Sequence, residues 1–176
     1  FRSSTYILVL IGVIVSMMAS AKLNATYQRY SAARSMCGLT GAEAAKRLLN
    51  SQGIYDVTIR RVPGSLTDHY DPRSKTVNLS DAVYGSTSIA AIGVAAHECG
   101  HAMQDAADYS PLRIRAALVP AANLGSQLAW PLILVGLLLG SGGSGLAFAG
   151  IVLFSLAVLF QLVTLPVEVN ASNRAL

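Results

Sequence analysis

The residues with the clearest chemical potential are two histidines and a glutamate in one short segment, His97-Glu98-Cys99-Gly100-His101. Residues four apart on an α-helix differ by about 400° and therefore lie on the same face, one turn apart. The imidazoles of His97 and His101 could then bind one Zn²⁺ ion together. Glu98 is rotated by about 100° from His97, so it could sit beside the metal and take a proton from a zinc-bound water. The H-E-x-x-H pattern thus predicts a zinc peptidase with Glu98 as the general base.

A catalytic zinc site needs a third protein ligand and one open position. The metzincin pattern, which supplies a third histidine, would put Gly at position 104 and His at position 107, but the chain has Gln104 and Ala107. Asp105 lies about 12 Å along the helix from His97, too far to share the ion, and is expected near the site or on the surface. Elimination leaves Glu168, an acid at the end of an apolar segment, where ionisable groups usually have a function. The alternative is a charge that reaches to the lipid headgroups.

Two further candidates, His69 and Tyr70, lie in a predicted loop upstream of this helix. A peptidase needs a hydrogen-bond donor for the oxyanion of its reaction intermediate, and either side chain could provide it. A loop residue bonded to the backbone is an equally good interpretation. Cys99 is rotated by about 200° from His97 and is predicted to be a packing residue. Gly100 is predicted to permit the close approach of another helix.

A polar region precedes and includes this helix. Its predicted elements are an amphipathic helix at residues 39–50, strands at 57–62 and 76–79, a loop at 63–75, and a helix that begins near Ser86 or Thr87 and ends near Ala107. Thr40 and Glu43 have the spacing of a capping box for the first helix. We expect the strand at 76–79 to be the edge of its sheet and to pair with an extended substrate.

The composition is that of a membrane protein. The chain of 176 residues is 53 % hydrophobic and 12 % charged, whereas soluble domains contain about 25 % charged residues. A bilayer requires about 20 apolar residues for one crossing. The sequence predicts three transmembrane helices, at residues 5–21, 118–139 and 146–166. The Gly/Ser segment 140–145 joins the last two into a helical hairpin. The two cysteines give no disulfide framework.

The distribution of basic residues predicts the orientation. Between the first two spans, residues 22–117 contain 11 of the 13 Lys and Arg. Three basic residues follow the first span closely and one precedes it: Lys22, Arg29 and Arg34, against Arg2. The positive-inside rule therefore places residues 22–117 in the cytosol. Two further crossings return residues 167–176, and with them Glu168, to the side of the histidines.

The partners expected from this pattern are the lipid bilayer and a peptide or membrane-protein substrate. The basic residues form no run with interleaved aromatics, so nucleic acid is not expected. The substrate's identity and the oligomeric state stay open. We expect the natural chain to continue beyond Phe1, which is not Met, and beyond Leu176.

Several segments resemble the YugP-like family of bacterial membrane zinc metallopeptidases. They are LTDHYDP at 66–72, SIAAIGVAAHE at 88–98, NLGSQLAWP at 123–131 and FQLVTLPVE at 160–168. The resemblance covers nearly the whole chain. It implies that His97 and His101 are zinc ligands, that Glu98 is the catalytic acid/base, and that the protein lies in the bacterial inner (plasma) membrane.

Glu168 is also similar in placement to the third ligand of the more distant HtpX and CAAX-prenyl gluzincin peptidases. In those families an Asp four residues after this Glu braces a histidine. Here the matching position is Ser172, and Asn170 is the other polar candidate. The resemblance therefore leaves open which residue braces the ligands.

The sequence as a whole predicts a mostly α-helical membrane protein. It has three transmembrane helices and a cytosolic α+β, zincin-like metallopeptidase region with the H-E-x-x-H helix. The expected function is that of a multi-pass, zinc-dependent metalloendopeptidase whose active site faces the cytosol. The alternative is a non-catalytic membrane scaffold or interaction protein stabilised by zinc. A structural zinc site uses four protein ligands, and the sequence offers few candidates for a fourth.

Overall fold

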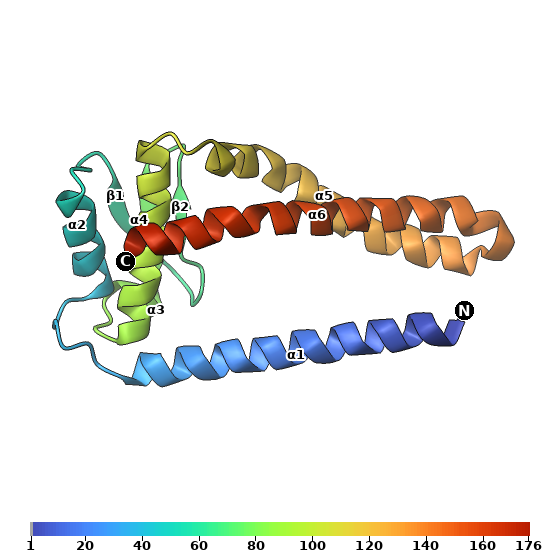
Figure 1. The fold of residues 1–176 in the computed structure, drawn as a ribbon, viewed down its shortest axis with the longest axis horizontal. Coiled ribbons are helices and arrows are strands. Elements are labelled where there is room, and N and C mark those ends of the chain that lie inside the picture. The colour runs from blue at the N-terminus through green and yellow to red at the C-terminus, as the bar shows by residue number, and fades with distance from the viewer. Residues whose placement is uncertain (1) are drawn as a thin grey trace. The chain divides into compact units, whose positions relative to one another are not determined.

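The computed structural model describes residues 2–176, which are mostly helical and include a small sheet (Figure 1). The elements in order are α1 (Arg2–Ala32), α2 (Gly41–Ser51), β1 (Thr58–Val62), β2 (His69–Asp71), β3 (Thr76–Ser80), α3 (Asp81–Tyr84), α4 (Ile89–Ala106), α5 (Ser110–Leu138), the 3₁₀ helix η1 (Gly140–Gly143) and α6 (Ser144–Ala175). The chain divides within α4 into two compact units, the first ending at Ala96 and the second beginning at His97. The mostly helical prediction is therefore confirmed.

The first unit contains a three-stranded sheet in the order β1–β3–β2. β3 pairs in parallel with β1 and antiparallel with β2, and all five of its residues are buried. The prediction of a strand at residues 76–79 is confirmed. The prediction that this strand is an edge is wrong, because β3 is hydrogen-bonded on both sides and cannot accept an extended substrate.

The strand β2 is a second difference between the structure and the prediction. It forms inside residues 63–75, which were predicted to be a loop throughout. A three-residue strand is too short to show an alternating pattern, and it exists because it pairs with β3, with Tyr70 opposite Val77. The predicted strand at 57–62 is present as β1.

Local capping signals define the helices of the first unit well. The capping box of α2 is formed: Thr40 Oγ1 accepts from the Glu43 amide at 3.2 Å, and Glu43 Oε2 accepts from the Thr40 amide at 3.1 Å. The buried face of α2 includes Ala45 and Leu49. Ser88 caps α4, because its Oγ accepts from the Ala91 amide at 3.1 Å. α4 therefore begins at Ile89, slightly later than predicted.

α4 ends where the backbone of Asp108 adopts a left-handed conformation with a φ of 54°. Asp tolerates this conformation better than most residues, and it cannot continue a right-handed helix. The end at Ala106 agrees with the predicted end near Ala107. The amide of Tyr109 then donates to the carbonyl of Gln104 at 2.9 Å and closes the helix terminus.

The second unit contains a long helical hairpin of α5 and α6, which lie side by side and are joined by η1 (Figure 1). Glycines permit close packing near the turn: a Cβ on Gly143 would lie 2.2 Å from the carbonyl oxygen of Gly136. α5 begins before the predicted span, at Ser110, so Arg113 and Arg115 belong to the same helix as the apolar segment. α6 continues past Pro166 and carries Glu168.

Within the described residues, three helices are long and apolar enough to cross a membrane: α1 from Tyr6, α5 and α6. The most apolar stretches of these helices are 0 %, 11 % and 11 % buried, in chain order. Large contiguous apolar surfaces are rare on soluble monomers. Apolar helices of this length are typical of membrane-spanning segments.

Candidate metal centre

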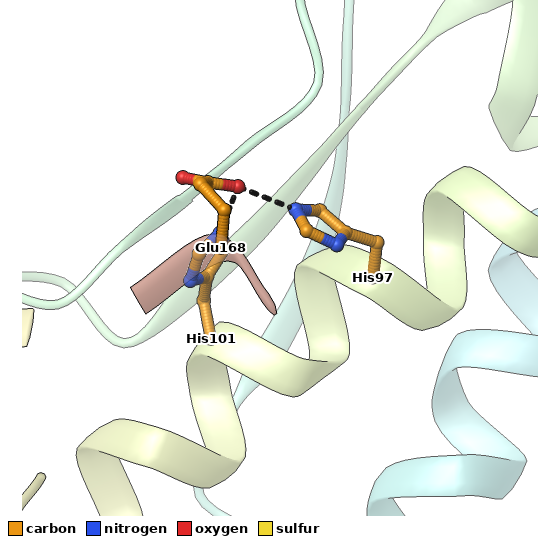
Figure 2. A group of neighbouring side chains, drawn as sticks. All are labelled: His97, His101 and Glu168. Atoms are coloured by element: carbon orange, nitrogen blue, oxygen red, sulfur yellow. Dashed lines mark hydrogen bonds and ion pairs between the residues drawn. The ribbon is translucent and has the colours of Figure 1, made fainter. Parts of the chain in front are cut away.

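His97, His101 and Glu168 form a group of potential metal ligands in the second unit. One ligand atom from each residue lies within 4.8 Å of the others. The histidines come from α4 and the glutamate from α6, so residues far apart in the sequence meet at one point. Figure 2 shows that the interactions of both imidazoles converge on one oxygen of the Glu168 carboxylate.

The distances in this group suit zinc. Glu168 Oε2 lies 2.9 Å from His97 Nε2 and 3.6 Å from His101 Nε2. Zinc bonds of about 2.0–2.2 Å in a tetrahedral arrangement place neighbouring ligand atoms about 3.3–3.6 Å apart. The separation from His101 lies at the upper end of this range, and the separation from His97 is shorter than the range. Two imidazoles and a carboxylate are also the donor set of known catalytic zinc sites.

Close contact between α4 and α6 creates the group. A Cβ on Gly100 would lie 2.1 Å from the carbonyl oxygen of Ala171, so the two helix backbones touch at this point. Ala171 is fully buried. The prediction that Gly100 permits close helix approach is confirmed. Glu168 lies one turn before Ala171 and is thereby brought over the histidine face of α4.

The other nitrogen of each imidazole also has a partner. His97 Nδ1 lies 2.9 Å from Ser172 Oγ, and His101 Nδ1 lies 3.0 Å from Gln104 Oε1. Such partners fix the orientation of a metal-binding ring and leave the opposite nitrogen for the metal. Of the two candidates that the sequence left open, Ser172 contacts His97 directly. Asn170 instead accepts a hydrogen bond from Gln104 at 3.1 Å.

Arg115 occupies the other side of the glutamate. Its Nη1 lies 2.7 Å from Glu168 Oε1, the oxygen that does not face the imidazoles. The hydrogen bond with Glu168 raises the pKa of His97, while partial burial of the ring acts in the opposite direction. The carboxylate of Glu168 thus lies between the guanidinium of Arg115 and the imidazole of His97.

The remaining residues of the H-E-x-x-H segment occupy different environments. Glu98 is half-buried, and its negative charge also favours the protonated form of His97, raising that pKa. Cys99 is fully buried, and burial raises the pKa of its thiol to about 12. A thiol held protonated in this way is not a metal ligand, which agrees with its predicted packing role.

His69 and Tyr70 lie on β2 in the first unit. His69 Nδ1 lies 2.9 Å from the carbonyl oxygen of Thr67, and its Nε2 lies 3.2 Å from Asn78 Nδ2. A ring that donates from Nδ1 and accepts at Nε2 satisfies both contacts, so His69 braces the strand pair. In the part of the chain that the structure describes, His69 is not a member of the ligand group. Its role in catalysis and that of Tyr70 stay predictions.

Sequence reasoning missed two residues of this centre. In the sequence, Gln104 was considered only because it departs from the glycine of the metzincin pattern. Arg115 was considered only as one of the basic residues. One signal for Gln104 was available, since it follows His101 by three residues and shares its helix face. Arg115 gave no such signal, because its partner is on another helix.

Comparisons with known proteins agree with this chemistry. Residues 5–176 match the family described as "Putative neutral zinc metallopeptidase". The chain is 48 % identical over 161 residues to the "Putative membrane protease YugP" of Bacillus subtilis (strain 168). That alignment covers 92 % of this chain and 71 % of the relative. No solved structure matches the chain.

Proposed function

Since the chain belongs to this family of neutral zinc metallopeptidases, we propose that it is a membrane-embedded, zinc-dependent endopeptidase. The observation that carries the proposal is the group formed by His97, His101 and Glu168, whose ligand atoms lie within 4.8 Å of one another. Two of these residues belong to the H-E-x-x-H segment that predicts zinc chemistry from spacing alone.

Each residue of the centre has a distinct task in peptide hydrolysis. His97 and His101 would hold zinc through Nε2, and Glu168 would hold it through Oε2. When bound, zinc supplies a Lewis acid that lowers the pKa of a water molecule to about 7 and polarises the substrate carbonyl. Glu98 accepts the proton of the attacking water and transfers it to the leaving amine.

The number of ligands favours catalysis over a structural role. Structural zinc sites use four protein ligands, whereas catalytic sites use three and keep one position for water or substrate. Among the described residues, the group contains three members. The alternative of a zinc-stabilised scaffold or interaction protein therefore has less support.

The membrane setting follows from the three long apolar helices and from the relative that is named a membrane protease. We place the site on the cytosolic face, as the excess of basic residues between α1 and α5 suggests. Glu168 follows the apolar part of α6, so a site at the membrane surface would reach peptides or the tails of membrane proteins. These substrates are part of the proposal.

Two substitutions test this assignment in purified, detergent-solubilised protein. Glu98→Gln should keep stoichiometric zinc and lower the rate of peptide or casein cleavage by about 10²–10⁴-fold, the usual contribution of a general base. Glu168→Ala should lose zinc affinity and activity together. Glu43→Ala, which removes the capping glutamate of α2, is the control and should keep both.

Other outcomes would contradict the proposal. Cleavage by Glu98→Gln within a few-fold of wild type would show that another residue is the base. Zinc bound by Glu168→Ala as tightly as by wild type would place the third ligand elsewhere. Stoichiometric zinc in a wild-type protein that stabilises the fold but cleaves no substrate would favour the scaffold alternative.

A further inference from the structure

Gln104 is the most completely buried polar side chain near the metal centre, with 0 % of its surface exposed. It lies on α4, one turn after His101, and has three hydrogen-bond partners. Oε1 lies 3.0 Å from His101 Nδ1, and Nε2 donates to the Val167 carbonyl at 2.8 Å and to Asn170 Oδ1 at 3.1 Å. A buried amide without hydrogen-bond partners is costly, and these three contacts compensate the burial of Gln104.

The partners determine which way the amide points. The carbonyl oxygen of Val167 can only accept a hydrogen bond, so the Gln104 atom that faces it must be the NH₂ group. Asn170 Oδ1 also accepts from Arg174 Nε at 2.7 Å, which identifies it as an oxygen. Gln104 Oε1 therefore faces His101, and an oxygen can only accept. The hydrogen between them must belong to His101 Nδ1.

This arrangement fixes the tautomer of His101. With its hydrogen on Nδ1, the neutral ring has its lone pair on Nε2, the nitrogen that faces Glu168. In the opposite tautomer, Nε2–H would point at Glu168 Oε2, and the Nδ1 lone pair would face Gln104 Oε1. That lone pair would lie only 3.0 Å from Gln104 Oε1 in a buried site, because His101 is 6 % exposed. The favoured tautomer also leaves a lone pair towards an acceptor, but at the longer distance of 3.6 Å between Nε2 and Glu168 Oε2, so the shorter contact decides where the hydrogen lies.

We propose that Gln104 is a positioning residue of the metal centre, which holds His101 in the metal-binding tautomer only while α6 is docked. The coupling arises because Nε2 of the same amide bonds Val167 and Asn170, the residues that flank Glu168 on α6. If α6 moved away, Gln104 would lose both acceptors and could rotate. The side chain of Gln104 thus links the position of Glu168 to the tautomer of His101. The metal part of this inference rests on the proposed function, whereas the tautomer does not.

The tautomer can be measured in the metal-free protein. The chain contains three histidines, so nitrogen chemical shifts of ¹⁵N-histidine-labelled protein can be assigned by substitution of each one. At a pH where His101 is neutral, wild type should carry the hydrogen on Nδ1, and Gln104→Met should give a mixture of tautomers. A hydrogen on Nε2 of His101 in wild type would overturn the proposal, even if no variant folds.

Zinc affinity provides the second measurement. Gln104→Met keeps the size of the side chain and removes its hydrogen bonds, and it should weaken zinc binding by about 10–100-fold in competition with a chromophoric chelator. The Co²⁺-substituted protein should show an altered visible spectrum. Gln161→Met, the same change at an exposed position of α6, is the matched control and should leave both unchanged.

A double-mutant cycle separates positioning from general stability. If Gln104 acts through His101, Gln104→Met should cause no further loss of zinc affinity in a His101→Ala background. An equal loss in both backgrounds, or wild-type affinity in Gln104→Met, would overturn the proposal. If wild type itself binds no zinc, the proposed function fails, and the tautomer measurement still decides the role of Gln104.

Discussion

The two oxygens of Glu168 have different partners, which matters for how the residue could bind a metal. Oε2 faces both imidazoles, whereas Oε1 is held by Arg115 at 2.7 Å. A guanidinium that occupies one oxygen favours ligation through the other oxygen alone. A carboxylate that binds through one atom leaves room for a water molecule at the metal. Arg115 would thus help to keep the catalytic position open.

Substitution of Arg115 should therefore change metal binding. Arg115→Met should weaken zinc binding by about tenfold or more, the range found for partners of metal ligands. Arg115→Lys should recover only part of the loss, because an ammonium lacks the planar geometry of the guanidinium. Competition with a chelator measures the zinc affinities of both variants.

Arg113 provides a matched control for this experiment. It lies two residues earlier on α5, is exposed, and pairs with Asp108 rather than with the ligand group. Arg113→Met should leave zinc affinity at the wild-type value. Equal losses in the Arg113 and Arg115 variants would mean that general charge, not the contact with Glu168, is responsible.

The two cysteines differ strongly in environment, and their reactivity should differ with it. Burial raises the pKa of Cys99 to about 12. Cys37 is exposed, and a hydrogen bond from Ser35 lowers the pKa of its thiol. Only the thiolate reacts with alkylating reagents. In the folded protein at pH 8, one thiol should react quickly, and peptide mapping should identify it as Cys37.

A change in Ser35 tests the cause of that reactivity. Ser35→Ala removes the hydroxyl that lies 3.0 Å from Cys37 Sγ. The thiol pKa should then rise and alkylation near neutral pH should slow, while Cys99 stays protected until the protein is denatured. Rapid labelling of Cys99 in the native state would contradict its buried position.

At the scale of the helices, the metal centre depends on how closely α4 approaches α6. Gly100→Ala would place a methyl group 2.1 Å from the Ala171 carbonyl oxygen, so α6 would have to move. Overpacking of this kind costs about 1–3 kcal/mol. We expect a lower unfolding temperature and weaker zinc binding, because Glu168 moves with α6.

Gly93 on the same helix is the control for helix propensity. Apart from its neighbours in the chain and the backbone of α4 itself, no atom lies within 4 Å of a Cβ built at Gly93. Gly93→Ala should therefore stabilise the protein by up to about 1 kcal/mol, as alanine does inside helices. Calorimetry should show opposite effects of the two substitutions on the unfolding temperature, and chelator competition should show weaker zinc binding for Gly100→Ala alone. A stabilised Gly100→Ala that binds zinc normally would contradict the close helix contact.

The elements that the sequence predicted correctly are those with local signals. The capping box of Thr40 and Glu43 acts within a few residues, so α2 could be located from the sequence. The start of α4 was predicted near Ser86 or Thr87, close to the cap that the structure places at Ser88. β2 could not be located from the sequence, because three residues form a strand only through their partner. The central position of β3 is likewise a property of the sheet and not of its own residues.

The candidate site divides in the same way. The spacing of His97 and His101 is a local property, and Glu168 could be reached by elimination. The contact of Gln104 with His101 is also local, but the contacts of Gln104 and Arg115 with α6 could not be predicted, because those partners lie more than 50 residues further along the chain. Tertiary packing decides such contacts, and a single sequence carries no direct record of it.

At the scale of the whole molecule, orientation in the membrane is the main prediction to be tested. In a Cys37→Ser background, single cysteines at Ser74 and Ser144, both exposed, report on opposite ends of the predicted spans. An impermeant thiol reagent applied to intact cells should label Ser144→Cys and leave Ser74→Cys unlabelled. Both should react after the cells are permeabilised. The reverse pattern in intact cells would show that the positive-inside rule was misapplied.

The position of Glu168 within α6 also has a consequence for biosynthesis. The ribosome completes both histidines of α4 before it begins either helix of the hairpin, and Glu168 follows almost all of that hairpin. In a nascent chain the candidate ligand set would therefore stay incomplete until α6 has been inserted and has packed against α4. In the proposed enzyme, maturation of the active site would wait for membrane integration, so that proteolysis begins only after the chain has reached its bilayer.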